Sequence, residues 1–235
     1  GLEQLQNEEY EKAIESFSEA LNIENRLWVR REILALMTKA ALALGDNLKA
    51  ALRFQIMVEN EPDARSFDLI PLDWGIKDTL SPARNAAQNW LTDSDEVKQL
   101  IGASILLTAP DYQAQAEATL RSLATSPQIN IQQLARTQLW RLRLRAGDIS
   151  LLELQRWERN LNQVPELLRA GPHFLLGTVY AMLERHGQAA ASFLWIPLAE
   201  NSNPQLSAEA SLKAADSILA MGQTVNALRL YQETA

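Results

Sequence analysis

Hydrophobic residues recur at three- and four-residue steps along most of the chain, which is the pattern of amphipathic helices. In the first such stretch the repeated positions are Tyr10, Ala13, Ile14, Phe17, Ala20 and Leu21, with acidic residues between them. This pattern predicts a helix over Glu8–Ile23. The same periodicity continues in Arg26–Leu44 and in Leu48–Asn60, which predicts two more helices.

Glycine followed by a capping residue marks the predicted turns. Gly45-Asp46 separates two helices because Gly fits the left-handed conformation that ends a helix and Asp can cap the next one. Gly147-Asp148 does the same between the predicted helices Ile131–Ala146 and Leu151–Val164. A weaker helical pattern covers Asp95–Thr108 and Tyr112–Thr125.

The stretch Gly171–Asn203 predicts two apolar helices packed against each other. Gly177 and Ala189 are small enough to let the two backbones approach closely, and Phe193 fills the space that remains. We place the turn at Glu184–Gly187. The alternative, with Gly187 as the turn glycine, puts the bulky Tyr180 where the backbones nearly touch. Such a hairpin cannot bury both faces alone, so it requires neighbours of the same shape.

The chain resembles the tetratricopeptide repeat, whose pattern combines small residues, aromatic residues, a Gly-Asp turn and Pro over about 34 residues. Four units match, through Gly1, Tyr10, Ala13, Phe17 and Ala20; Gly45, Ala50, Phe54 and Pro62; Gly177, Tyr180, Ala189 and Phe193; and Ala215, Gly222, Ala227 and Tyr231. The resemblance implies an all-α, right-handed superhelix of about six helical hairpins with one irregular insertion.

The expected organisation has three parts: repeats over 1–64 with the first truncated, an irregular insertion with a short helix over 65–92, and repeats over 93–235 with the last truncated. Pro71, Gly75 and Pro82 predict that Ser66–Ser81 is irregular or at most a short turn. Ser81-Pro82 then caps a helix that ends at Leu91. Such a segment is either functional or packed over a neighbouring repeat, and its apolar content favours packing.

The charge and composition of the chain argue against several classes of function. The net charge of −7 argues against nucleic-acid binding, and no apolar run is long enough to span a membrane. The absence of Cys excludes disulfides and thiolate metal sites but leaves a cytoplasmic or exported location open. Because Gly1 falls inside a repeat, we expect a piece of a longer protein. Its cut ends would expose apolar faces through which copies could associate.

The sequence does not predict an enzyme, a cofactor or a metal site. His173 and His186 are the two histidines and cannot form a metal pair, which needs two imidazoles one helical turn apart. No nucleophile elbow, phosphate-binding glycine loop or dinucleotide fingerprint is present. The acidic pairs Asp93/Asp95 and Asp73/Asp78 fall at turns and helix starts, where carboxylates cap amides.

A basic stretch, RTQLWRLRLR, contains the strongest binding candidates. The resemblance places first helices along a concave groove, which turns Gln138, Arg141 and Arg145 inward. The two guanidinium groups lie one turn apart and suit a carboxylate, so an acidic peptide or chain terminus is a plausible ligand. The alternative is that these arginines pair with Glu residues of the next repeat. By the same resemblance, the remaining inward polar residues are Lys39, Thr178, Lys213 and Asp216.

Two of the six tryptophans lie in irregular surroundings, Trp74 in PLDWG and Trp195 in LWIP. They either cover an adjacent surface or form a peptide-docking pocket. For the helical Trp28, Trp140 and Trp157 we expect packing.

Together these features predict a protein–protein interaction scaffold that binds a peptide or a partner protein in a concave groove. Two alternatives remain from the sequence. The chain could be a helical-repeat accessory domain of a larger enzyme, for example one that acts on the cell wall, or an architectural scaffold whose groove is filled by its own insertion.

Overall fold

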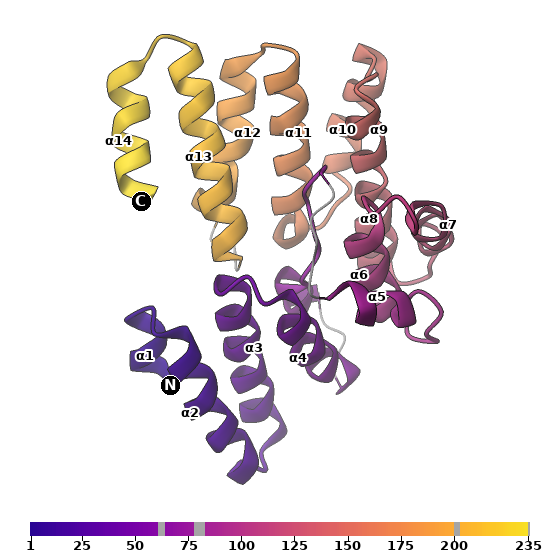
Figure 1. Ribbon diagram of the computed structural model, residues 1–235, viewed down its shortest axis with the longest axis vertical. Coiled ribbons are helices and arrows are strands. Elements are labelled where there is room, and N and C mark those ends of the chain that lie inside the picture. The colour runs from indigo at the N-terminus through magenta and orange to yellow at the C-terminus, as the bar shows by residue number, and fades with distance from the viewer. Residues whose placement is uncertain (61–63, 78–82, 200–202, 235) are drawn as a thin grey trace.

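The computed structural model of the chain describes residues 1–60, 64–77, 83–199 and 203–234. All regular secondary structure in these ranges is helical, and they contain no β-strand. Helices that follow one another in the sequence pack largely as pairs (Figure 1). The prediction of an all-α protein is therefore confirmed.

The N-terminal helices lie where the hydrophobic pattern predicts them. They are α1 (Leu2–Gln6), α2 (Tyr10–Ile23), α3 (Leu27–Ala43) and α4 (Asn47–Asn60). In the turn between α3 and α4, Gly45 has a φ of +70°. Asp46 accepts a hydrogen bond from the backbone N–H of Lys49 at 3.0 Å and so caps α4. The predicted Gly-Asp turn is confirmed.

The irregular segment begins with a 3-10 helix, η1 (Ala64–Leu69), and continues without regular secondary structure to Lys77. This agrees with the prediction of an irregular stretch with at most a short turn. We call residues 67–77 the central segment. Helix α5 (Arg84–Trp90) follows it. The predicted Ser81-Pro82 cap lies outside the described residues.

The helices after α5 agree with the sequence except at two points. They are α6 (Glu96–Leu106), α7 (Gln113–Leu123), α8 (Ile129–Gln138), α9 (Trp140–Ala146), α10 (Leu151–Leu161) and the 3-10 helix η2 (Glu166–Leu168). The helix predicted over Ile131–Ala146 is divided at Leu139 into α8 and α9. Directly after this break, the Trp140 ring stacks on Trp157 of α10 with centroids 4.7 Å apart. The other predicted helix, Leu151–Val164, ends three residues early, where the chain turns into η2.

The C-terminal helices are α11 (Ala170–Met182), α12 (His186–Leu198), α13 (Pro204–Ala220) and α14 (Thr224–Thr234). The left-handed residue between α11 and α12 is Glu184, with a φ of +57°. Gly187 lies inside α12, so the alternative that made it the turn glycine is wrong. The turn comprises residues 183–185, so it begins one residue and ends two residues earlier than the predicted Glu184–Gly187.

A small residue facing a phenylalanine fixes the packing in two helix pairs far apart in the sequence. A Cβ atom on Gly177 would lie 2.7 Å from Phe193 Cε1, and one on Gly1 would lie 2.5 Å from Phe17 Cε1. Either contact is too short for a real side chain, so only Gly allows these helices to approach so closely. The predicted role of Gly177 is confirmed.

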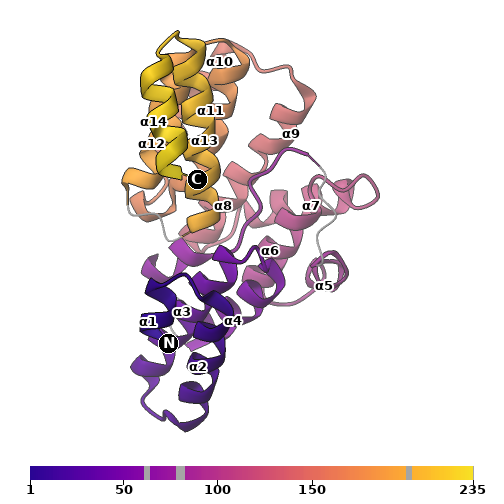
Figure 2. The ribbon, with the colours of Figure 1, turned by 60° about the vertical axis from the view of Figure 1, so that its left-hand side comes forward.

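The helix pairs curve until the C-terminal helices meet the N-terminal ones (Figures 1 and 2). Helix α13 contacts α3, and the Gln205 side chain comes within 3.8 Å of the place where a Cβ on Gly45 would lie. Inside this curve, the central segment runs as an extended ribbon between α11 and the helices α6, α8 and α9 (Figure 1). It is therefore flanked by helices on two sides.

Candidate functional site

Arg141 is the hub of a buried polar cluster that holds the central segment. Its side chain is 0% exposed and forms an ion pair with Asp73 at 2.7 Å. It also donates hydrogen bonds of 2.7 Å to the backbone carbonyls of Gly75 and Ser104 and to Gln138 Oε1. Burial lowers the pKa of the guanidinium, and the Asp73 carboxylate opposes this shift. A charge so deeply buried persists only because these groups compensate it.

Two neighbours of Arg141 bind the backbone of the same residue. Gln138 donates from Nε2 to the Asp73 carbonyl at 3.1 Å. Ser104 Oγ accepts from the Asp73 backbone N–H at 2.9 Å and donates to the Asp73 carbonyl at 3.2 Å. The surface of α6, α8 and α9 that faces the interior is thus occupied by the chain itself.

The apolar side chains of the central segment belong to the hydrophobic core. Phe67 is 1% exposed and meets the Phe54 ring edge-on at 5.8 Å. Trp74 is 8% exposed and lies directly on Gly171 of α11, where an added Cβ would come 1.9 Å from the Trp74 ring. The favoured interpretation of this stretch, that it packs over the neighbouring part of the fold, agrees with these contacts.

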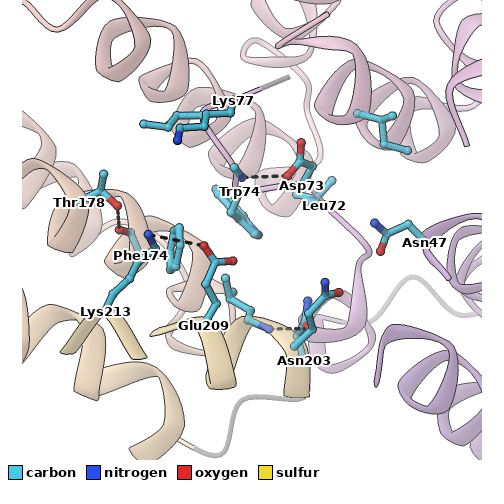
Figure 3. A pocket seen from close by; sticks show the side chains of 15 residues that line it. Asn47, Leu72, Asp73, Trp74, Lys77, Phe174, Thr178, Asn203, Glu209 and Lys213 are labelled. Carbon is cyan, nitrogen blue, oxygen red and sulfur yellow. Dashed lines mark hydrogen bonds and ion pairs between the residues drawn. The ribbon is translucent and has the colours of Figure 1, made fainter. Parts of the chain in front are cut away.

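An open cleft lies along the other side of the central segment (Figure 3). Its volume is about 460 Å³, within the range of ligand-binding clefts, roughly 300–1,000 Å³. The lining comes from the central segment, from α6, from α11, from the start of α4, and from α13 with the residue before it. These residues are Leu72, Asp73, Trp74, Gly75, Ile76 and Lys77; Ile105; Phe174 and Thr178; Asn47; and Asn203, Gln205, Leu206, Glu209 and Lys213.

Both polar groups and aromatic rings line this cleft. The Lys213 ammonium lies 5.6 Å from the centre of the Phe174 ring and 3.7 Å from Glu209. Thr178 donates its hydroxyl proton to the Phe174 carbonyl at 2.8 Å, which leaves the hydroxyl oxygen free to accept. Within the described ranges, no hydrogen bond or ion pair involves the exposed Lys77 side chain. Lys77, Thr178 and Lys213 lie on one side of the cleft and Asn47 on the other (Figure 3).

The structure brings together three of the residues singled out from the sequence, Trp74, Thr178 and Lys213, because all three line the cleft. Gln138 and Arg141 do turn inward. However, they are 0% and 1% exposed and hold the central segment. The expectation that they face an open groove is therefore corrected: the acidic group that meets Arg141 is the chain's own Asp73.

The other predicted binding residues lie outside the cleft. Arg145 is exposed and donates to the Thr108 carbonyl at 2.8 Å. Lys39 is exposed on α3, and the exposed Asp216 accepts a hydrogen bond from the Tyr231 hydroxyl. Trp195 is half-buried and stacks on His173, with ring centroids 4.2 Å apart.

The packing predicted for the three helical tryptophans is confirmed for two of them. Trp140 and Trp157 are buried, as expected, but Trp28 is 63% exposed beneath the Arg26 guanidinium, so its predicted packing is wrong.

The carboxylates predicted to cap amides were Asp93, Asp95, Asp73 and Asp78. Asp95 accepts hydrogen bonds from the backbone N–H groups of Val97 and Lys98 and so caps α6. Asp73 also accepts from the Gly75 N–H at 2.8 Å, while Asp78 lies outside the described residues.

Sequence reasoning missed the cleft residues Lys77 and Glu209 and the pairing of Asp73 with Arg141. The available signal was the single acidic residue in PLDWG, which has no basic neighbour nearby in the sequence other than Lys77. Asp73 and Arg141 are 68 residues apart in the sequence. Their hydrogen bond therefore produces no local periodicity from which it could be predicted.

The described residues contain no group of three or more His, Cys, Asp or Glu residues placed to hold a metal ion. Among the same residues, no helix combines the length and the apolar character that crossing a membrane requires. Comparison of the chain with protein-family models, with curated proteins and with solved structures gave no match.

Proposed function

We propose that this chain is a protein–protein interaction scaffold built from repeats like those of the tetratricopeptide family. The succession of helix pairs supports this proposal. So does the recurrence of one packing contact, Gly1 with Phe17 and Gly177 with Phe193. Both pairs occupy the small and aromatic positions at which the sequence resembles that family.

The observation that carries the proposal is the cleft between the central segment and helices α11 and α13. Separate parts of the chain meet there and surround an open space of about 460 Å³. The space offers rings, ammonium groups, a hydroxyl and amides, which are the groups that recognise peptides. In this proposal the partner binds in the cleft, and the neighbouring surface around Arg141 stays filled by the central segment.

Peptide selection followed by charge reversal tests this function. Random dodecapeptides displayed on phage are selected on the immobilised whole chain, and the best binders are synthesised. We expect Lys213→Glu to weaken their binding at least tenfold, because the substitution reverses a charge in the cleft. Lys39→Glu makes the same charge change on an exposed part of α3 outside the cleft and should leave affinity within twofold. Equal effects of the two variants, or no selected peptide, would contradict the proposal.

A second candidate function is favoured by the buried cluster around Arg141. Because the chain fills its own interior surface, it could serve as an architectural piece with no ligand in the cleft. This candidate predicts that selection yields no peptide sensitive to Lys213→Glu. The same experiment therefore separates the two functions.

A further inference from the structure

The central segment uses the backbone groups on one of its sides and leaves those on the other side without partners. On the used side, the N–H and C=O of Asp73 both bond to Ser104 Oγ, at 2.9 and 3.2 Å. The Gly75 carbonyl accepts from Arg141 at 2.7 Å. These groups therefore face α6, α8 and α9.

In a trans peptide the C=O of one residue and the N–H of the next point in opposite directions, and no peptide bond among the described residues is cis. The N–H and C=O of Trp74, and the N–H of Ile76, must then face away from Arg141. Residues 72–77 all line the cleft. Among the described residues, no hydrogen bond involves the backbone groups of Trp74 or Ile76.

A row of unpaired backbone groups beside an open cleft has the character of a strand edge without a neighbour. Unpaired N–H and C=O groups in a largely buried residue are costly, so such groups favour a partner. Trp74 is 8% exposed, and the wall facing it across the cleft is formed by helices, which offer side chains and no strand. The open space beside these groups has a volume of about 460 Å³.

We propose that the cleft binds an extended peptide of a partner protein, which pairs its backbone with Trp74 and Ile76 as an added strand. This inference rests on the proposed scaffold function and specifies the form of its ligand. Strand addition takes affinity from main-chain hydrogen bonds and specificity from alternate side chains. The second edge of the peptide would meet the polar groups of α11 and α13, including the accepting oxygen of Thr178.

The cleft also indicates which side chains the peptide carries. Alternate side chains of a strand point to one face, and the apolar lining from Ile105, Phe174 and Leu206 fits apolar residues at alternate positions. Because Asp73 is paired with Arg141, the charges left are Lys77 and Lys213 against Glu209. This excess of one positive charge favours an acidic residue in the peptide.

Backbone methylation of the peptide tests the pairing directly. Each residue of a selected dodecapeptide is N-methylated in turn, and binding to the whole chain is measured. We expect methylation at alternate positions to weaken binding at least tenfold, and methylation at intervening positions to change it less than threefold. On the protein, hydrogen exchange of the Trp74 and Ile76 amides should slow at least tenfold when the peptide is bound.

A pair of variants at one position provides the matching test on the protein. Ile76→Pro removes the N–H that would pair and should weaken binding at least tenfold, whereas Ile76→Val keeps it and should stay within twofold. If Ile76→Pro fails to fold, the methylation and exchange measurements decide the question alone.

The outcomes separate this inference from the function on which it rests. Peptides that lose binding with Lys213→Glu, yet show no alternation on methylation and no slowing at Trp74 and Ile76, would overturn strand addition and leave the scaffold function intact. Peptides whose binding is unaffected by Lys213→Glu, or the absence of any binding peptide, would overturn both.

Discussion

The two sides of the central segment differ in what their polar residues do. On the filled side, Ser104, Gln138 and Arg141 are buried and each bonds to the segment. On the open side, Glu209 is exposed and Lys213 partly exposed, and the contacts that the structure describes for them lie within α11 and α13. The helices on the filled side, α6, α8 and α9, thus hold the central segment in place. The helices on the open side, α11 and α13, present polar residues to solvent.

This difference has an energetic basis. A buried charge is expensive to leave without its partner, so the filled side should control folding. A partly exposed pair such as Lys213–Glu209 contributes little, since water already solvates both groups. We therefore expect changes on the filled side to reduce stability, and changes on the open side to reduce binding.

Replacing Arg141 should have the largest effect. Arg141→Met keeps an apolar stem but leaves the Gly75 and Ser104 carbonyls and the Asp73 carboxylate without their donor. We expect the free energy of unfolding to fall by about 3 kcal/mol, the range found when one partner of a buried ion pair is removed. Urea unfolding followed by circular dichroism measures this change.

Arg145→Met is the control for that variant, one helical turn away. Arg145 is exposed and bonds to one carbonyl and one amide side chain, so its loss should cost less than about 1 kcal/mol. A similar cost for both variants would mean that the cluster around Asp73 has no special role.

Gly171→Ala should have the next largest effect, because it presses on the central segment from the α11 side. The added Cβ would lie 1.9 Å from the buried Trp74 ring, which must move. We expect a loss of about 2 kcal/mol, typical of overpacking a core. Gly187→Ala is the matched control. Its nearest atom would be Met221 Sδ at 3.7 Å, so no loss of stability is expected.

Local periodicity predicted most of the helices. The ends of α2, α3 and α4 fall within two residues of the predicted ones, and the contact of Gly177 with Phe193 followed from residue size alone. These features depend on residues close in the sequence or on one packed pair of helices. They are therefore visible without the fold.

The site required information that periodicity does not contain. Arg141 and Arg145 share a helix face, yet only Arg141 reaches Asp73, which lies 68 residues away in the sequence. The cleft likewise depends on α13 returning toward the central segment and α3. The sequence identified Trp74, Thr178 and Lys213 separately. It could not predict that all three line the same cleft.

The burial of His173, whose ring stacks on Trp195, should make stability depend on pH. Burial, together with the nearby Arg169 charge, lowers the pKa of His173 from 6.5 to about 4. The unfolded chain then binds a proton more readily than the folded one between these pH values, so stability falls as the pH drops below 6.5. We expect a loss of up to about 1 kcal/mol between pH 6.5 and 5.5.

His173→Phe isolates that contribution, since Phe keeps a ring against Trp195 but cannot be protonated. The Nδ1 atom of His173 has no hydrogen-bond partner within the described part of the chain, so the variant removes no bond there. Unfolding curves at both pH values should show a smaller decrease for the variant than for the wild type. Equal decreases would exclude His173 as the source.

Lys213→Met should have the smallest effect on stability and makes the comparison with Arg141→Met direct, because both replace a charge with the same apolar side chain. Lys213 loses a pair at 3.7 Å, whose partner is 54% exposed, and a contact at 5.6 Å with the Phe174 ring. We expect unfolding to change by no more than about 0.5 kcal/mol, because exposed pairs are worth little and Met preserves the packing of the stem. The measurement is the same urea titration. A cost near that of Arg141→Met would show that the open side also holds the fold together, and that the two sides of the central segment are not functionally distinct.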